Sequence, residues 1–130
     1  MIILDTHIWV WWAHGSESLS DAQVQTIQAS ERDGIGVSTI SVWEIAKLVE
    51  YGRLDVSCPL REWFEKALTY PGVRLVEMTP QIAIESTRLP GDFHSDPADQ
   101  IIVATARVHD SPLVTADRRI LAYPHVSTVP

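Results

Sequence analysis

The sequence predicts an α/β fold, a three-layer α/β/α sandwich around a central parallel sheet of about five strands. One observation is the continuous apolar run at residues 2–4, which is typical of a parallel strand that is covered on both faces. Another is that strand-like and helix-like segments alternate along the chain, which favours right-handed crossovers and a parallel sheet. The third is size and composition: 130 residues with 45% hydrophobic and 21% charged side chains suit one globular domain. We therefore treat residues 1–130 as a single domain.

The elements follow from apolar periodicity and from the residues that start and stop helices. Strands are expected at residues 2–4, 35–39, 73–78, 112–115 and 126–129. Helices are expected at residues 6–14, 21–32, 41–51, 60–68, 80–87 and 97–109, with a helical turn at 118–122. Pro130 suits an edge position for the last strand, because proline cannot donate to a neighbouring strand.

Tryptophan is abundant for a chain of this length. We expect Trp9 and Trp12 to pack in the core, and Trp11 to do so less completely, because three residues within four positions of a helix cannot all face one side. Trp43 and Trp63 are expected in the core as well.

Charge and cysteine content restrict the location and the partners. The single cysteine, Cys58, cannot form an internal disulfide, and we expect a cytoplasmic protein. No run is long enough to span a membrane, so no membrane association is expected. The net charge of −7 argues against broad, sequence-independent binding to phosphates. A nucleic-acid substrate remains compatible with this charge if the acidic residues surround a bound metal ion.

Acidic residues occur where strands end and where helices begin. Asp5 ends the first strand, Glu44 lies near the start of the helix after the second strand, Asp99 near the start of the helix before the fourth strand, and Asp117 just after that strand. Strand ends and helix starts share one edge of a parallel sheet, which is where such sheets bind ligands. We therefore expect these four carboxylates to converge there, with Asp96 as a fifth candidate.

Each of these residues also has a purely structural interpretation. The stretch Ser41-Val42-Trp43-Glu44 matches a capping box, and Asp96-Pro97 looks like an N-cap followed by proline at the first helical position. Asp117 could cap the short turn that follows it. Asp5 has the weakest structural interpretation, because Thr6 could cap the first helix without adding a charge.

The set as a whole favours a metal site. Several carboxylates in one place repel one another, and a divalent cation removes that penalty. Hard oxygen ligands suit Mg²⁺ or Mn²⁺, which share phosphate oxygens with their substrates. One or two such ions would support hydrolysis of a phosphodiester bond without a serine or cysteine nucleophile.

Four motifs in this order resemble the PIN-domain ribonucleases, and in particular the VapC-type toxins of bacterial toxin–antitoxin pairs. They are Leu4-Asp5-Thr6-His7, Ser41-Val42-Trp43-Glu44-Ile45-Ala46, the stretch from His94 to Ala106, and Leu113-Val114-Thr115-Ala116-Asp117. The resemblance covers nearly the whole chain. One departure is Gln100, where many relatives carry arginine.

The resemblance implies a PIN-like fold and a Mg²⁺- or Mn²⁺-dependent endoribonuclease. The catalytic residues it implies are Asp5, Glu44, Asp99 and Asp117. Asp5 and Asp99 would bind the metal directly, and Asp96 and Asp117 are further candidate ligands. Thr6 and Thr115 would support the site. It also implies an RNA substrate (tRNA or mRNA), a cognate antitoxin protein and a homodimer.

Two other classes of protein also place an aspartate after the first strand of a parallel sheet. An aspartyl-phosphate phosphatase would need a second aspartate two residues after Asp5, where this chain has His7. A receiver-like or protein-binding module without catalytic activity would also have an acidic pocket. It would need an aspartate at the end of the third strand and a late lysine, but no lysine follows Lys66. The sequence therefore favours the nuclease.

Overall fold

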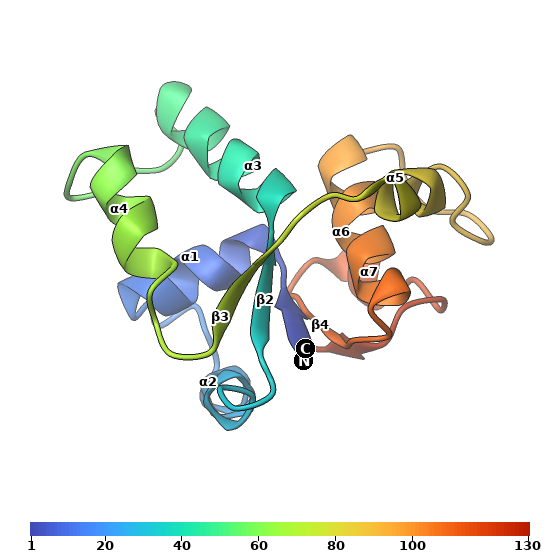
Figure 1. The fold of residues 1–130 in the computed structure, drawn as a ribbon, viewed down its shortest axis with the longest axis horizontal. Helices are drawn as coiled ribbons and strands as arrows, with labels where there is room; N and C mark the ends of the chain where they lie inside the picture. Colours follow the sequence, from blue (N-terminus) through green and yellow to red (C-terminus); the bar gives the residue numbers. More distant parts are fainter.

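The computed structural model describes residues 1–130 and contains one five-stranded sheet in which all strand pairs are parallel (Figure 1). The strands lie in the order β3, β2, β1, β4, β5, so β1 is central. Their bounds are β1 Ile2–Leu4, β2 Ile35–Ser38, β3 Val73–Val76, β4 Leu113–Val114 and β5 Thr128–Val129. The predicted fold class is confirmed, and β5 lies at an edge as expected.

The helices form two groups, one on each side of the sheet (Figure 1). One group consists of α1 (Thr6–His14), α2 (Asp21–Ala29), α3 (Thr39–Glu50) and α4 (Leu60–Ala67). The other consists of α5 (Pro80–Ser86), α6 (Pro97–Val108) and α7 (Arg118–Leu121). None of these helices has both the length and the hydrophobicity that crossing a membrane requires.

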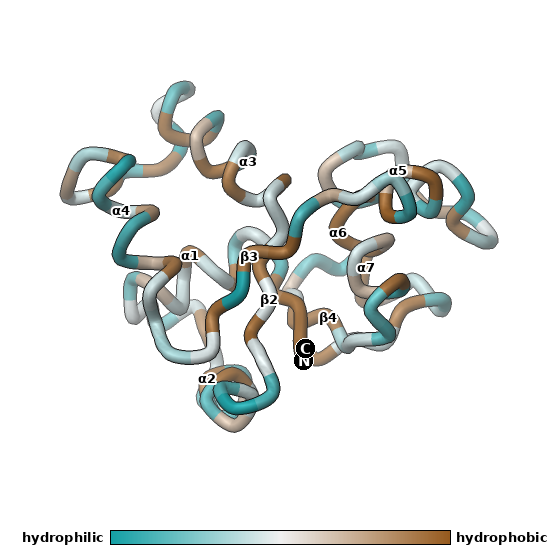
Figure 2. The backbone as a smooth tube through the Cα atoms, viewed as in Figure 1, coloured by the Kyte–Doolittle hydropathy of each residue, from teal (hydrophilic) through white to brown (hydrophobic).

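Two hydrophobic cores fill the spaces between the sheet and the helices. Side chains alternate between the two faces of a strand, and β1 shows the consequence: Ile2 and Leu4 belong to the core that contains Trp9, whereas Ile3 belongs to the core that contains Ile102. Figure 2 shows this arrangement as hydrophobic strands in the middle of the molecule and hydrophilic outer turns. Strand β1 is therefore held from both sides, which fixes the position of the residue that follows it.

The strand register brings the carboxyl ends of the central strands together. Leu4 is paired with Val37 of β2 and with Val114 of β4. The backbone N–H of Asp5 donates to the carbonyl oxygen of Val114 at 3.0 Å, which extends this pairing by one residue. The segments that leave β1, β2 and β4 therefore begin side by side at one edge of the sheet.

Two predictions about the helix after β2 are wrong. Helix α3 begins at Thr39 instead of residue 41, because the Ser38 side chain caps it by accepting from the N–H of Ile40 at 3.1 Å. Ser41 is thus inside the helix and buried, and the capping-box interpretation of Glu44 fails. Trp63 is buried as expected, but 55% of Trp43 is exposed to solvent.

Gly72 lies in the turn before β3, which packs closely against the segment that contains Glu31. It adopts a left-handed conformation with φ of 83°, and a Cβ atom added there would lie 2.4 Å from the carbonyl oxygen of Glu31. Gly52 also has a positive φ, 67°, but a Cβ atom there would meet nothing within 4 Å. The two glycines therefore separate the cost of the backbone conformation from the cost of a steric clash.

We expect Gly72→Ala to lower the free energy of unfolding by about 3 kcal/mol, because strain at positive φ and overpacking against the backbone add together. Gly52→Ala should lower it by only about 1 kcal/mol, from the backbone conformation alone. Urea denaturation of both variants and the parent measures the difference. Equal losses would show that the turn at Gly72 shifts to accommodate the methyl group.

Candidate active site

Asp5 lies at the end of the central strand and is buried, with only 7% of the residue exposed. Its Oδ1 accepts a hydrogen bond from the backbone N–H of Thr6 at 2.8 Å, and its Oδ2 accepts one from the Thr115 hydroxyl at 2.8 Å. Asp5 is therefore itself the N-cap of α1, so it has the structural role that the sequence analysis considered possible for Thr6. Both carboxylate oxygens are oriented by donors that carry no charge.

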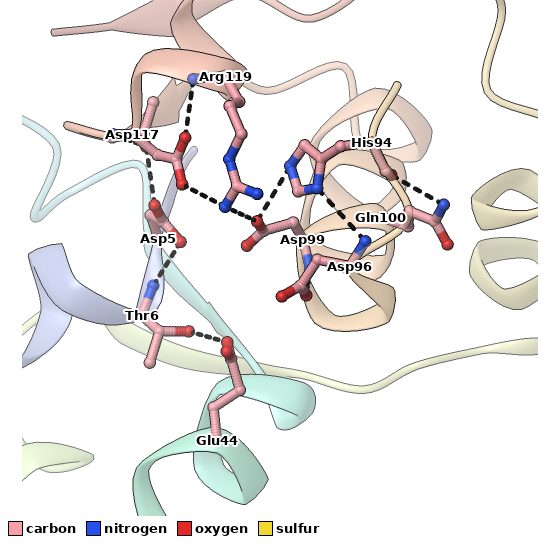
Figure 3. Close-up of polar contacts among 10 residues, drawn as sticks. Asp5, Thr6, Glu44, His94, Asp96, Asp99, Gln100, Asp117 and Arg119 are labelled. Carbon is pink, nitrogen blue, oxygen red and sulfur yellow. Dashed lines mark hydrogen bonds and ion pairs between the residues drawn. The ribbon is translucent and has the colours of Figure 1, made fainter. Parts of the chain in front are cut away.

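Glu44 reaches the same place from α3. Its Oε1 accepts a hydrogen bond from the hydroxyl of Thr6 at 2.6 Å. The same hydroxyl oxygen lies 2.8 Å from the hydroxyl of Ser41. Since Thr6 has one proton to give and gives it to Glu44, Ser41 is the donor in the second bond. Thr6 therefore links two helices and holds the Glu44 carboxylate beside Asp5 (Figure 3).

The start of α6 contributes a third group of side chains. Asp96 is the N-cap, and its Oδ1 accepts from the N–H of Asp99 at 3.1 Å. The Oδ2 of Asp99 lies 3.2 Å from Nε2 of His94, within ion-pair distance but without the alignment of a hydrogen bond. Nδ1 of His94 accepts from the N–H of Asp96 at 3.3 Å, so in the neutral ring the proton is on Nε2, the nitrogen that lies close to Asp99.

Gln100, the departure from the family pattern, has a structural contact. Its side-chain amide donates to the carbonyl oxygen of His94 at 3.0 Å. Gln100 therefore ties the loop before α6 to the helix and helps to position the His94 ring. The sequence motif contained His94, but no role for it was predicted.

Asp117 caps α7, as its structural interpretation predicted, and also faces the other acidic residues. Its Oδ1 accepts from the N–H of Arg119 at 2.8 Å. The guanidinium group of Arg119 lies 3.3 Å from Oδ2 of Asp117 and 3.5 Å from Oδ2 of Asp99. Thr115 connects this segment to the centre, because its hydroxyl oxygen accepts from the N–H of Asp117 at 3.0 Å while its proton goes to Asp5.

These side chains line one cavity of about 290 Å³ at the carboxyl edge of the sheet. Its lining contains every acidic residue predicted for the site, namely Asp5, Glu44, Asp96, Asp99 and Asp117. Thr6, which was predicted as a supporting residue, also lines it. The rest of the wall consists of residues that were not predicted for the site, namely His7, Trp11, Ala116 and Arg119.

A model of the PIN domain matches residues 2–126 of this chain. The chain belongs to the PIN-domain family. The family that the four sequence motifs indicated is thereby confirmed, and the receiver-like alternative is set aside. The chain is also 37% identical over 124 residues to Ribonuclease VapC22 of Mycobacterium tuberculosis (strain ATCC 25618 / H37Rv), a match that covers 95% of this chain and 92% of that protein.

Solved structures show the same fold. A chain of VapBC2 from Rickettsia felis, bound to a DNA fragment from its promoter, superposes with a TM-score of 0.72 at 15% identity and covers 99% of this chain and 98% of that one. FitAcB from Neisseria gonorrhoeae gives a TM-score of 0.69 at 18% identity and covers 100% of this chain and 97% of that one. At these identities the likeness concerns the fold of the PIN domain.

Burial and mutual repulsion raise the proton affinity of three carboxylates in this PIN domain. Burial raises the pKa of Asp5, although the bonds from Thr115 and Thr6 oppose the change. Burial also raises the pKa of Glu44. The pKa of Asp99 rises to about 7, first through burial and then through the negative charges of its acidic neighbours. Such shifts mark a site that gains from a bound cation.

Asp117 behaves differently. Burial alone would raise its pKa, but the hydrogen bonds and the positive charge of Arg119 bring it below its ordinary value. The donors to Asp5 and Glu44 are thus neutral, whereas Asp117 carries a charged donor.

The donor set of this PIN domain fits a hard divalent cation. All the candidate ligands are carboxylate oxygens, which Mg²⁺ and Mn²⁺ prefer. No three acidic, histidine or cysteine side chains are drawn together into a closed metal cage. An open arrangement suits Mg²⁺, which keeps several waters and binds through one or two carboxylates together with phosphate oxygens.

The pKa of Asp99 predicts how stability without metal depends on pH. Below about pH 4 the carboxyl group is protonated in both the folded and the unfolded chain; between about pH 4 and pH 7 the unfolded chain releases the proton while the folded chain retains it. The folded state therefore loses stability as the pH rises to about 7. Asp99→Asn, which cannot ionise, removes this loss.

In the presence of a chelator we expect Asp99→Asn to be more stable than the parent at pH 8, by on the order of 1–2 kcal/mol, because solvent screens part of the repulsion. At pH 4 the two should unfold alike. Thermal melts across this range measure the effect, and the exposed Asp33, replaced by asparagine, is the control. A stability difference that is independent of pH would contradict the repulsion between the carboxylates.

Proposed function

We propose that this PIN domain is a divalent-metal-dependent endoribonuclease and the toxin of a toxin–antitoxin pair. The observation that carries the proposal is the convergence of Asp5, Glu44, Asp99 and Asp117 from four separate segments on one cavity. The similarity to Ribonuclease VapC22 supports the choice of RNA as the substrate.

Asp5 and Asp99 are the proposed direct ligands of Mg²⁺ or Mn²⁺, and Asp96 and Asp117 are further candidates. A metal ion held there would act as a Lewis acid on the phosphodiester and would make an attacking water more acidic. Asp5 suits a fixed ligand, because the donors on its two oxygens and the burial of β1 leave it little freedom. Asp96 has Oδ2 available, since the cap of α6 uses Oδ1.

The remaining side chains orient the reactants. The Thr6 hydroxyl holds Oε1 of Glu44, which leaves Oε2 to orient the attacking water and to accept its proton. Burial raises the pKa of Glu44, which makes its carboxylate a better proton acceptor. Arg119 stands at the rim with 59% of its side chain exposed and would meet a phosphate of the substrate.

We also propose an antitoxin protein and a second copy of this chain as partners. Support for the antitoxin comes from the structural neighbours, which include VapBC2 of Rickettsia felis and a toxin–antitoxin complex from Klebsiella pneumoniae with a TM-score of 0.68 and 20% identity. Support for a second copy comes from apolar side chains on and near the edge strand β3, where Leu75 and Met78 are about half exposed. The cytoplasmic location stays a prediction.

We expect the purified protein to cleave single-stranded RNA with Mg²⁺ or Mn²⁺ and not with a chelator. Asp5→Asn and Asp99→Asn should each lower the rate by at least about 100-fold, because each removes a proposed ligand while keeping the shape of the side chain. Initial rates on a labelled RNA measure this effect.

Glu17→Gln, in the exposed loop after α1, is the matched control and should keep full activity. Mn²⁺ should also raise the melting temperature of the parent and of Glu17→Gln, and raise that of Asp5→Asn much less. Full activity in Asp99→Asn, or cleavage that persists in the chelator, would rule out the proposed mechanism.

A further inference from the structure

The surface beside the acidic cavity has two further hollows, both along α3. One, of about 490 Å³, lies between Trp43 and the start of α6 at Pro97. The other, of about 380 Å³, lies along Trp43, Lys47 and Tyr51. Glu44 lines the acidic cavity and both of these hollows. Asp96 lines the acidic cavity and the hollow at Pro97. The three hollows therefore adjoin one another around Glu44, and together they extend from the acidic cavity along α3.

An aromatic and basic stripe lines this path. Trp43, Lys47 and Tyr51 are four residues apart in sequence and thus lie on one face of α3. Trp43 is 55% exposed and Tyr51 66% exposed, so both rings present large surfaces to solvent. The Lys47 ammonium lies 6.0 Å from the centre of the Trp43 ring and 5.5 Å from the centre of the Tyr51 ring.

The charge of the stripe stands out in this chain. The net charge is −7, and Lys47 is one of only two lysines. Arg53, which is also exposed, lines the far end of the second hollow. Cations interleaved with exposed aromatic rings form the usual surface for single-stranded nucleic acid, since the rings stack on bases and the cations neutralise phosphates.

We propose that the stripe formed by Trp43, Lys47, Tyr51 and Arg53 binds the single-stranded RNA that flanks the scissile phosphate. This inference rests on the proposed function, because the stripe would hold the part of the RNA strand that extends from the phosphate bound at the acidic cavity. From Trp43 to Tyr51 the helix rises about 12 Å, which matches about three or four nucleotides at the spacing of a stacked strand. The rings supply sequence-tolerant stacking, and Lys47 supplies a phosphate contact.

The test measures RNA binding separately from cleavage. A fluorescein-labelled single-stranded RNA of twelve nucleotides and mixed sequence is titrated, with Mg²⁺, against proteins that all carry Asp5→Asn, so that cleavage is slow on the time scale of the titration. We expect Trp43→Ala to weaken binding about tenfold, the loss typical of one stacked base, and Trp43→Phe to retain most of the affinity. Tyr51→Ala should weaken binding several-fold.

Matched controls lie elsewhere on the molecule. Tyr70 is an exposed aromatic residue outside the acidic cavity and the two hollows along α3, and Tyr70→Ala should bind as the parent does. The side chain of Lys47 is 40% exposed and that of Lys66 is 66% exposed, and each pairs with a glutamate on its own helix. Lys47→Ala should reduce the slope of log Kd against log salt concentration by about 0.7, the value for one phosphate contact on a single strand, and Lys66→Ala should leave it unchanged.

Cleavage by the unmodified active site gives a second readout. There we expect Trp43→Ala to raise KM about tenfold and to leave kcat within about twofold, because the stripe holds the flanking strand and does not touch the reacting phosphate. If the parent cleaves no RNA but the stripe variants still weaken binding, the proposed function fails and the stripe stands. If cleavage occurs with unchanged KM and Kd in Trp43→Ala and Tyr51→Ala, the stripe is refuted and the nuclease stands.

Three other outcomes would also refute the stripe. One is that the Asp5→Asn parent fails to bind the RNA at concentrations up to about 100 μM, which corresponds to a very weak association. Another is that Tyr70→Ala loses as much affinity as Trp43→Ala. The third is that Trp43→Ala changes the sedimentation coefficient and leaves RNA affinity unchanged, which would assign this face to contact with a second copy of the chain.

Discussion

The burial of a carboxylate at the end of the central strand is the constraint on which the rest of the site depends. Asp5 is fixed by hydrogen bonds from Thr6 and Thr115, and those donors orient its charge without neutralising it. A buried charge with only neutral partners is costly unless a cation compensates it. Each further acidic residue at this edge adds to the cost, and burial together with the charges of these neighbours raises the pKa of Asp99 to about 7.

The donors around the cavity change in kind with depth. At the bottom, hydroxyl groups and a backbone N–H hold Asp5 and Glu44. At the rim, His94 and Arg119 face Asp99 and Asp117. Neutral donors at the bottom leave the negative charge available to an ion, whereas the guanidinium of Arg119, 59% exposed at the rim, can also meet a phosphate. This gradient supports a site in which the ion enters deeply and the substrate lies across the opening.

Much of this arrangement followed from the sequence, because it depends on rules of strands and helix starts. The apolar run before Asp5 and the positions of Asp99 and Asp117 were enough to place these residues at one edge of a parallel sheet. The start of α3 was missed, since Ser38 and Ser41 can both cap a helix, and only the tertiary contact of Ser41 with Thr6 distinguishes them. The contacts of His94 and Arg119 depend on loop geometry that no periodicity encodes.

The error at Trp43 has a simple geometric cause that also bears on how an acidic protein can hold RNA. Ser41 and Ile45 are buried and lie one helical turn apart, so they define the inner face of α3. Trp43 lies midway between them in sequence, about 200° around the helix from either, and must therefore face outward. The same rotation puts Lys47 on the outer face beside it. A chain with a net charge of −7 cannot attract RNA over its whole surface, so a short outward-facing row of rings and cations next to the acidic cavity confines the contact to the one place where a metal-dependent site could use it.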